Sequence, residues 1–273
     1  MQQNLISGST NLKMLAQAQK EGFVRDGYLI VRGLIPPEVV SAVRADLERS
    51  LGIDAYLPAT WKSVQETKDW AWGAGPLTVP CRPEAVERVA EELVGPHFLR
   101  GASLHPFKSL VGLRAEEAGY IPVLTYPEPG EPRFVQPGGW HVDGEPDHVT
   151  LPPTCLLIML AYLTDTPTHG GATCVQPGSH RVVFEHLMKD GTLPSRQGEG
   201  IPLAGQAGDV IFMHFLLVHS GSRNTSDHVR IGLNTNVLPD PDHPIAPRQG
   251  EPDENWTPFD RTLRTDNLPR GNG

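Results

Sequence analysis

An unbroken apolar run sets the strongest limit on how this chain folds. Nine residues, 155–163, read Cys-Leu-Leu-Ile-Met-Leu-Ala-Tyr-Leu, and they lie between Pro153 and Asp165. The run has the length of a strand rather than of a helix, and turn-forming residues bound it, so we predict a strand buried on both faces. Such a strand needs packed side chains above and below it, which favours a layered β architecture.

Short strands and turns follow a start that is richer in helices. The 28 Gly and 27 Pro residues are typical of a protein with many turns. Helical spacing of apolar residues predicts helices around 22–26, over 36–51 and over 83–94. Strands are predicted over 28–32, 98–113, 120–126, 155–163, 172–176, 210–219 and 229–237, with another at Trp140. This order indicates a mainly β fold, a jelly roll or double-sheet barrel with helices outside.

The length of 273 residues fits one domain of this kind with additions at both ends. We expect an N-terminal arm at 1–18, a single domain at 19–238, and a Pro-rich C-terminal tail at 239–273 that packs on the domain. Trp256 and Phe259 are the expected anchors of this tail.

The composition disfavours several kinds of partner. A net charge of -9 and scattered Lys and Arg residues argue against nucleic acid or an anionic membrane, although one pocket arginine is enough to bind an anionic small molecule. The three Cys residues form no Cys-x-x-Cys pair, which favours a reduced compartment. The first residues lack the features of a signal peptide, and no apolar window approaches the roughly 18 residues of a membrane span. We therefore expect a cytoplasmic protein.

The segment 140–144, Trp-His-Val-Asp-Gly, carries the first chemical signal. Residues i and i+2 of a strand point to the same face, so His141 and Asp143 would present an imidazole and a carboxylate side by side. His219, far along the chain, is the candidate third ligand. Two histidines and one carboxylate, with open positions left on the metal, are the ligand set of non-haem Fe(II) oxygenases. A His-x-Asp motif on its own is more often part of a surface turn than of a metal site, so the assignment depends on the other motifs of the chain.

The predicted strand 229–237 carries a second signal. Arg230 shares one strand face with a glycine and two asparagines, Gly232, Asn234 and Asn236. An arginine on a core strand needs an anion, and its guanidinium group matches a carboxylate in a two-point contact. The anion is either a bound carboxylate or an internal Asp or Glu.

With these residues in view, the chain resembles the phytanoyl-CoA dioxygenase family of Fe(II)/2-oxoglutarate oxygenases over roughly residues 20–238. The matching motifs are the segment 22–34, His141-Val142-Asp143, Gly171-Ala172-Thr173 running into 177–181, Gly208-Asp209-Val210, and His219 with Arg230 eleven residues later. Each motif alone is common, whereas the set in this order is specific.

The resemblance implies a double-stranded β-helix in which His141, Asp143 and His219 hold Fe(II). It also implies that Arg230 pairs with the distal carboxylate of 2-oxoglutarate. Thr173 matches a position that helps to bind this co-substrate in fungal biosynthetic members, although a strand hydroxyl bonded to backbone is an equally good interpretation.

Two positions depart from the family pattern. Many members have a lysine before the metal motif, where this chain has the segment 126–130, Tyr-Pro-Glu-Pro-Gly, so that co-substrate contact is either lost or made by Tyr126. Relatives often have an aromatic residue eighteen positions after the first histidine, where this chain has Met159. Five other polar residues are expected to be structural or to lie in loops: His148, His169, His180, Arg181 and His214.

The resemblance implies a dioxygenase that uses O2, converts 2-oxoglutarate to succinate, and hydroxylates a small organic substrate or oxidises it in a related way. A secondary metabolite or an acyl compound is the expected substrate. Asp143 favours hydroxylation over halogenation, because related halogenases have Gly or Ala at this position. The segments 52–82, 127–136 and 183–206 are expected to be loops that shape the substrate pocket, although the first is equally compatible with a packed surface excursion.

Two other classes of protein remain open at this point. One is a non-catalytic, cupin-like protein that binds a metal or a small molecule. The other is a hydrolase that uses the same three ligands for zinc, which often binds such sites more tightly than ferrous iron. Succinate release that depends on iron and oxygen distinguishes the oxygenase from both.

Overall fold

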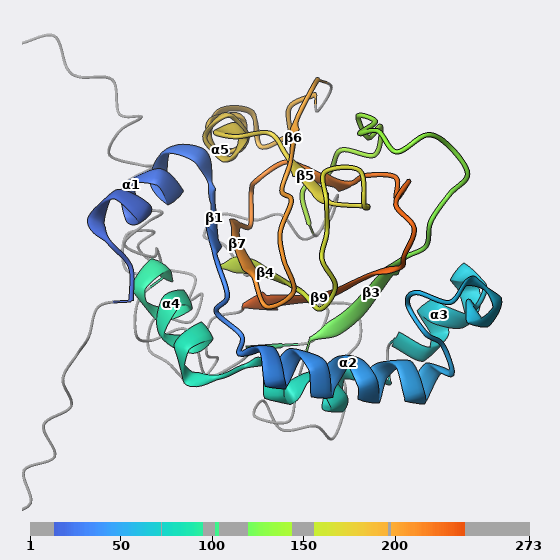
Figure 1. Ribbon diagram of the computed structural model, residues 1–273. Helices are drawn as coiled ribbons and strands as arrows, with labels where there is room; N and C mark the ends of the chain where they lie inside the picture. The colour runs from blue at the N-terminus through green and yellow to red at the C-terminus, as the bar shows by residue number, and fades with distance from the viewer. Residues whose placement is uncertain are drawn as a thin grey trace, which may run out of the picture.

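Two antiparallel β-sheets form the centre of the molecule, with helices around them (Figure 1). The computed structural model describes residues 14–71, 73–94, 102–103, 120–143, 156–195 and 198–237. The larger sheet has the strand order β1-β7-β4-β9-β2, with β3 also paired to β9, and the smaller sheet has the order β6-β5-β8. Side chains of both sheets share one buried cluster, as in a double-stranded β-helix.

The described elements follow the predicted order, with helices early and short strands after them. The strands are β1 (Tyr28–Val31), β2 (Ala102–Ser103), β3 (Ile121–Thr125), β4 (Leu157–Tyr162), β5 (Thr173–Val175), β6 (Ile201–Pro202), β7 (Val210–His214), β8 (His219–Gly221) and β9 (Arg230–Val237). The helices are α1 (Gln17–Asp26), α2 (Pro37–Leu51), η1 (Pro58–Thr60), α3 (Val64–Ala71), η2 (Gly75–Cys81), α4 (Glu84–Val94) and α5 (Ser179–Asp190). In these ranges, no helix combines the length and the apolar character that crossing a bilayer requires.

Residues 157–162 of the apolar run form β4, the strand between β7 and β9 in the larger sheet. All six residues of β4 are buried, as its composition predicted. Its side chains alternate between two layers. Leu157, Met159 and Ala161 belong to the core beneath the helices, whereas Ile158, Leu160 and Tyr162 face the smaller sheet.

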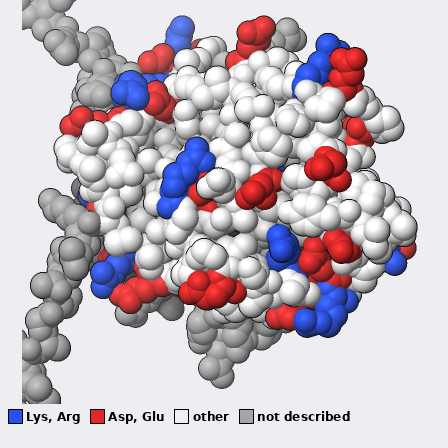
Figure 2. Space-filling model, viewed as in Figure 1, with Lys and Arg blue, Asp and Glu red and all other residues white. Residues whose placement is uncertain are grey.

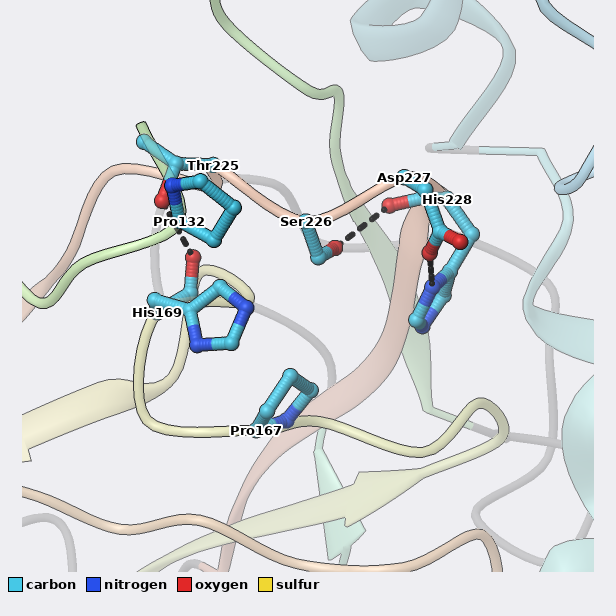
Figure 3. Close-up of a pocket in the computed structure, with 7 residues that line it drawn as sticks. All are labelled: Pro132, Pro167, His169, Thr225, Ser226, Asp227 and His228. Carbon is cyan, nitrogen blue, oxygen red and sulfur yellow. Dashed lines mark hydrogen bonds and ion pairs between the residues drawn. The ribbon is translucent and has the colours of Figure 1, made fainter. Parts of the chain in front are cut away.

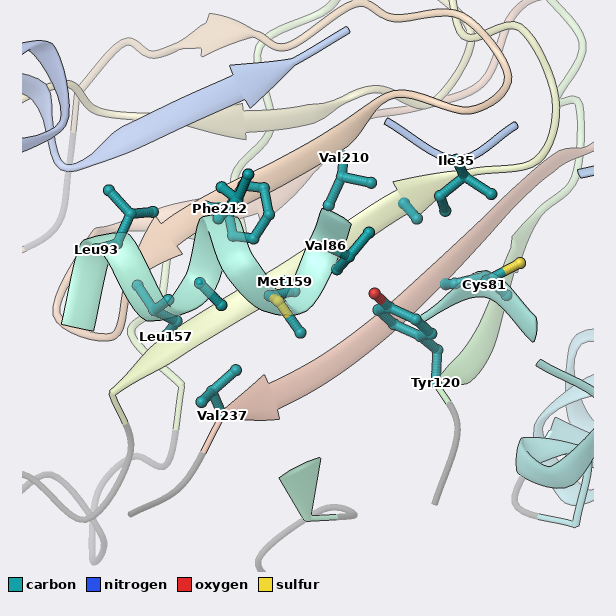
Figure 4. Close-up of a cluster of buried hydrophobic side chains, with 14 of the residues drawn as sticks. Ile35, Cys81, Val86, Leu93, Tyr120, Leu157, Met159, Val210, Phe212 and Val237 are labelled. Carbon is teal, nitrogen blue, oxygen red and sulfur yellow. The ribbon is translucent and has the colours of Figure 1, made fainter. Parts of the chain in front are cut away.

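The helix α4 covers the outer face of the larger sheet (Figure 4). Apolar residues at helical spacing, including Val86 and Leu93, are buried against Met159 and Phe212. Fully burying one such side chain stabilises the fold by about 1.5–3 kcal/mol. This layer fixes β4 and β9 from outside, so their inner faces are held in one position relative to the smaller sheet.

The turn between α1 and β1 explains part of the motif at 22–34. Gly27 has φ 81°, a backbone conformation that favours glycine. A Cβ atom at this position would collide with the ring of His180 and with Leu217. The Nε2 atom of His180 in turn donates to the carbonyl oxygen of Val24, at 3.1 Å. His180 is therefore a packing residue that joins α5 to α1, as expected.

The Gly208-Asp209 motif closes another turn. The carboxylate of Asp209 accepts hydrogen bonds from the backbone N–H of Gly33 at 2.8 Å and of Gln206 at 2.7 Å. It also forms an ion pair with Arg32 at 2.6 Å. Because these bonds join the end of β1 to the start of β7, Asp209 has a structural role.

The prediction of one strand over 210–219 was wrong. The chain forms β7 in the larger sheet, crosses at 215–218, and then forms β8 in the smaller sheet. All four crossing residues are buried, and they are Phe215, Leu216, Leu217 and Val218. Because the connection is as apolar as the strands, hydrophobicity alone does not mark the change of sheet.

Other boundaries also differ from the expectations. The segment 52–82 contains η1, α3 and η2, and the expected loop at 183–206 begins inside α5. The sequence did not predict this helix, which follows Pro177 directly and has Gly178, with φ 78°, as its N-cap. Of the arm expected at 1–18, the structure describes residues 14–18, where Leu15 is 3% exposed and α1 begins at Gln17.

Some predictions fall wholly or mostly outside the described ranges. The tail at 239–273, with Trp256 and Phe259, lies there, as do His148, Cys155 and Arg196. Of the strand expected at 98–113, only β2 is described. On the face of the molecule in Figure 2, Lys and Arg residues are scattered among Asp and Glu residues.

Candidate metal centre

Three side chains from distant segments converge at the start of β8. The ligand atoms of His141, Asp143 and His219 all lie within 4.8 Å of one another. The Oδ1 atom of Asp143 is 3.7 Å from Nε2 of His141 and 3.4 Å from Nε2 of His219. Among the described residues, this is the one group of three or more His, Cys, Asp or Glu side chains with metal-binding geometry.

Main-chain hydrogen bonds hold the two histidines in register. The N–H of His141 donates to the carbonyl of His219 at 3.0 Å, and the N–H of His219 donates back at 2.9 Å. His141 forms an isolated antiparallel bridge here, not part of the longer strand expected at Trp140. His219 also pairs with Val175 of β5. The spacing of the two rings, 4.4 Å between centroids, is thus fixed by the backbone.

The second nitrogen of each imidazole has a backbone acceptor. Nδ1 of His141 donates to the carbonyl of Gly139, and Nδ1 of His219 donates to that of Leu217, both at 2.9 Å. A ring that carries its proton on Nδ1 presents the Nε2 lone pair, which is the form that binds a metal. Both Nε2 atoms face the carboxylate of Asp143.

The exposure and charge of the three side chains differ. The His141 side chain is 46% exposed, that of Asp143 24% and that of His219 9%. Burial lowers the pKa of His219, but the hydrogen bond and the negative charge of Asp143 outweigh it, so the pKa is raised overall. The site therefore has one solvent-facing side, which suits a metal that keeps open positions for further ligands.

Arg230 lies at the start of β9 and is 4% exposed. Burial lowers the pKa of its guanidinium group, and its Nε atom has no hydrogen-bond partner. No described Asp or Glu forms an ion pair with it, so the internal partner considered from the sequence is not found among these residues. Because an unpaired buried cation is costly, this position calls for an anion from outside the described chain.

A tyrosine that the sequence interpretation missed links Arg230 to Thr173. The hydroxyl of Tyr162 donates to the carbonyl of Leu203 at 2.9 Å and accepts from the N–H of Thr173 at 3.3 Å. Burial raises the pKa of Tyr162, whereas the positive charge of Arg230 lowers it. Thr173 itself is 7% exposed. The structure thus brings Thr173 and Arg230 to one buried end of the barrel.

The side chains of Tyr126 and Met159 pack into the core under the helices, although Tyr126 directly follows Thr125, which pairs with Arg230. The hydroxyl of Tyr126 lies 2.8 Å from that of Thr67 on α3, and its ring contacts Trp61. Met159 points into the core under the helices, so the missing aromatic at this position does not leave a gap in the barrel. Its neighbours Leu160 and Tyr162 are the β4 side chains that face the interior.

A surface pocket of about 370 Å³ has a lining that includes none of the three triad residues (Figure 3). Its lining includes His169 and His228, together with Asp227, Thr225, Ser226, Pro132 and Pro167. The ring of His228 is bonded at both nitrogens, to Asp227 and to the carbonyl of Asp165, each at 2.8 Å. These bonds hold the loop in place, and His169 contributes a loop side chain, as expected.

The comparison with protein families now decides the class. The model of the family described as phytanoyl-CoA dioxygenase (PhyH) matches residues 23–232, which is most of the chain. The chain belongs to the phytanoyl-CoA dioxygenase family. It is therefore a non-haem oxygenase that depends on Fe(II), 2-oxoglutarate and O2, and it acts on a small molecule.

One curated protein is similar to this chain in sequence, and two solved structures are similar to it in fold. An ectoine dioxygenase of Stutzerimonas stutzeri (strain A1501) is 25% identical over 242 residues, which cover 78% of this chain and 73% of that protein. The apo structure of EctD from S. alaskensis aligns with a TM-score of 0.54 at 20% identity, over 84% of this chain and 79% of that one. The epimerase SnoN from nogalamycin biosynthesis aligns with a TM-score of 0.51 at 21% identity, over 81% and 82%.

Proposed function

We propose that His141, Asp143 and His219 hold the iron of this phytanoyl-CoA dioxygenase family member. The observation that carries this proposal is the convergence of three ligand atoms within 4.8 Å from segments almost 80 residues apart. Imidazole nitrogen and carboxylate oxygen are donors that suit Fe(II). The backbone acceptors at Gly139 and Leu217 support the neutral form of each imidazole that metal binding needs.

We further propose that Arg230 binds the distal carboxylate of 2-oxoglutarate, with Thr173 and Tyr162 beside it. The buried guanidinium, whose Nε atom lacks a partner, fits a carboxylate in both charge and hydrogen-bonding capacity. Tyr162 positions Thr173 through its hydrogen bond to that residue's N–H. We leave Tyr126 out of the co-substrate site, because its hydroxyl is engaged with Thr67.

The bound iron and 2-oxoglutarate supply the chemistry, which is the O2-dependent conversion of 2-oxoglutarate to succinate coupled to oxidation of a substrate C–H bond. The chain supplies orientation and a dry interior. Arg230 fixes one end of the co-substrate, and the apolar side chains Leu160, Val175 and Leu217 exclude water from the space between the sheets. Asp143 provides the negative charge that two neutral imidazoles lack.

The substrate is proposed to be a small organic metabolite, such as a secondary metabolite or an acyl compound. The names of two relatives, which refer to ectoine and to nogalamycin biosynthesis, support this class. We also propose that the enzyme works in the cytoplasm, because the cysteines of the described chain, Cys81 and Cys174, are free and buried.

The experiment that tests the function measures succinate. Purified full-length protein is incubated with 2-oxoglutarate in air, with Fe(II) or Zn(II) added in parallel, and succinate is measured by NMR. We expect slow succinate release with Fe(II), even without the primary substrate, and none with Zn(II) or without oxygen. Absence of release, together with retained metal binding, would favour the non-catalytic cupin-like alternative.

A further inference from the structure

The strand face that carries Arg230 continues along β9 toward the C-terminal end of this strand. Gly232 and Asn234 follow on this face, because alternate residues of β9 point the same way. The Cζ atom of Arg230 lies 3.7 Å from the position that a Cβ on Gly232 would occupy. The guanidinium group therefore extends along β9 to the level of Gly232, and Asn234 is the first polar side chain beyond it.

Pairing across the barrel gives the level of Asn234 relative to the triad. The hydrogen bond between Thr173 and Tyr162 places β5 of the smaller sheet and β4 of the larger sheet at one level. Two residues along β5, about 6.6 Å further, Val175 pairs with His219.

The same step along β4 reaches the neighbour of Asn234. Two residues from Tyr162, Leu160 pairs with Asn234 of β9. Both steps lead toward the Asp26-Gly27 turn. The N–H of His214, in the larger sheet, donates to the carbonyl of Gly27, and the N–H of Gly178, which follows β5 of the smaller sheet, donates to the carbonyl of Asp26. Asn234 thus lies on the wall opposite His219, at the level of the metal ligands.

The amide of Asn234 is not satisfied within the described chain. The side chain is half-buried, and its Oδ1 atom is buried without a hydrogen-bond partner. The flanking residues on the two neighbouring strands are Leu160 and Ile121, which offer no polar group. An unsatisfied buried polar atom is costly to stability, so a ligand that bonds to it regains that free energy on binding.

The strand positions around Asn234 are uncharged. From Gly232 to the C-terminal end of β9, the inward positions of β3, β4 and β9 carry no Asp, Glu, Lys or Arg. These positions are Ile121, Val123, Ile158, Leu160, Gly232, Asn234 and Asn236. Outside these strands, Lys68 of α3 lines a pocket with Ile121 and Val123 at the β3 edge. A charged group of a substrate would find no counter-ion on these three strands beside Asn234, whereas a neutral hydroxyl or amide would find a donor and an acceptor in Asn234.

We propose that Asn234 binds a neutral hydrogen-bonding group, a hydroxyl or an amide, of the primary substrate, and so selects uncharged polar substrates at the metal. This inference rests on the proposed function of the triad and of Arg230. Asn234 is a specificity-determining residue in this scheme, because it holds the substrate and takes no part in the oxidation.

The test uses three ring-matched probes that differ in charge: cyclohexanecarboxamide, cyclohexanecarboxylate and cyclohexylmethylammonium. Protein is loaded with Mn(II) and 2-oxoglutarate, and the broadening of each probe's NMR signals by the paramagnetic ion reports binding beside the metal. Zn(II)-loaded protein is the diamagnetic control. The 2-oxoglutarate signals in the same samples report whether the metal and co-substrate sites are intact.

Two variants of equal size separate hydrogen bonding from shape. Asn234→Leu removes the polar group, and Asn234→Asp adds a negative charge. In the wild type we expect the amide to bind best of the three probes. We expect Asn234→Leu to weaken the amide about fivefold, which is the effect of one neutral hydrogen bond, and Asn234→Asp to shift the preference to the ammonium probe.

Each outcome has one meaning. The following outcomes apply to samples in which Mn(II) still broadens 2-oxoglutarate. The role of Asn234 would be overturned if the wild type binds the three probes equally or binds none of them. It would also be overturned if Asn234→Asp keeps the wild-type preference. Loss of 2-oxoglutarate broadening in Asn234→Leu alone would reassign Asn234 to the co-substrate. If the wild type itself fails to broaden 2-oxoglutarate, the proposed function of the triad and Arg230 fails instead.

Discussion

Two pairs of histidines lie in this protein at similar ring separations, and they differ in almost every other respect. The rings of His141 and His219 are 4.4 Å apart, and those of His180 and His214 are 5.2 Å apart. The first pair shares a carboxylate, Asp143, and is partly exposed. The second pair is buried, and burial together with the charge of His214 lowers the pKa of His180 to about 3.

The backbone contacts of the two pairs explain the difference. In the first pair, Nδ1 of each ring is bonded to a carbonyl two residues away, so both Nε2 atoms point to the same carboxylate. In the second pair, His180 bonds to Val24 through Nε2, and Nδ1 of His214 accepts the N–H of Leu216. Proximity of two imidazoles is therefore not enough for a metal site; the direction of the remaining lone pairs decides.

The largest expected effect separates the pairs by metal binding. Asp143→Ala and His219→Ala each remove a proposed ligand. We expect each variant to reduce iron affinity and succinate release by more than about a hundredfold, which is a larger loss than for residues that only orient the ligands. Equilibrium dialysis with Fe(II) under anaerobic conditions measures the first quantity. A circular dichroism melt close to that of the wild type is the control, and unchanged turnover in either variant would remove the assignment.

The matching change in the second pair should affect stability instead. His180→Ala removes a fully buried ring that packs between α5 and the α1–β1 turn, so we expect the free energy of unfolding to fall by about 2–4 kcal/mol. Urea denaturation measures this change. At temperatures where the variant is folded, iron affinity should match the wild type, and a loss of iron would mean that the two pairs are coupled.

The pH dependence of stability sharpens the same contrast. The pKa of His180 is about 3 in the folded protein, below its ordinary value of 6.5, so between these limits the unfolded chain takes up a proton that the folded chain does not. The contribution of the neutral His180 ring to the free energy of unfolding is therefore fully present above pH 6.5, and it is lost as the pH drops toward 3. Urea denaturation at several pH values should give a shallower decline for His180→Gln than for the wild type.

A smaller effect is expected at the buried end of the barrel. Arg230→Met keeps an unbranched side chain and removes the guanidinium group with its charge, so we expect 2-oxoglutarate to bind roughly ten- to a hundredfold more weakly, as for loss of a charged hydrogen bond. Calorimetric titration of the Zn(II)-loaded protein with 2-oxoglutarate measures this. Zn(II) affinity serves as the control, and a fall in metal affinity instead would show that the arginine has another role.

The smallest effect concerns Tyr162. Tyr162→Phe removes a hydroxyl that positions Thr173, and we expect about a fivefold rise in the KM for 2-oxoglutarate with little change in kcat, because one neutral hydrogen bond is lost. Thr173→Val gives the matched comparison at the other end of this contact. A fall in kcat with unchanged KM would place Tyr162 outside the co-substrate site.

Much of the fold was open to prediction because its signals are local. The apolar run of β4, the helical spacing of α2 and α4, and the alternation in β9 each depend on a few neighbouring residues. The crossing at 215–218 was missed because its residues are as apolar as the strands they join. Helix α5 was missed as a whole, because the turn-forming residues Pro177 and Gly178 stand directly before it and its residues from 183 onward were assigned to a loop.

The candidate site likewise contains residues that the sequence singled out and residues that it missed. The motif at 141–143 and the arginine at 230 were singled out from residue types that need a partner wherever they are buried. Tyr162 was not, because an unbroken apolar run contains no alternation that separates an inward from an outward side chain. Asn234 was placed on the Arg230 face from the sequence, but its unsatisfied amide becomes visible only when the neighbouring strands are known.

The reciprocal backbone bonds between His141 and His219 have a consequence for how the enzyme is assembled. Because peptide groups rather than the ion set the spacing of the two imidazoles, the protein is already shaped for its metal before any metal arrives. Loading therefore requires little reorganisation of the chain, and an enzyme stripped by a chelator should regain activity on simple re-addition of ferrous salt, without a cycle of refolding.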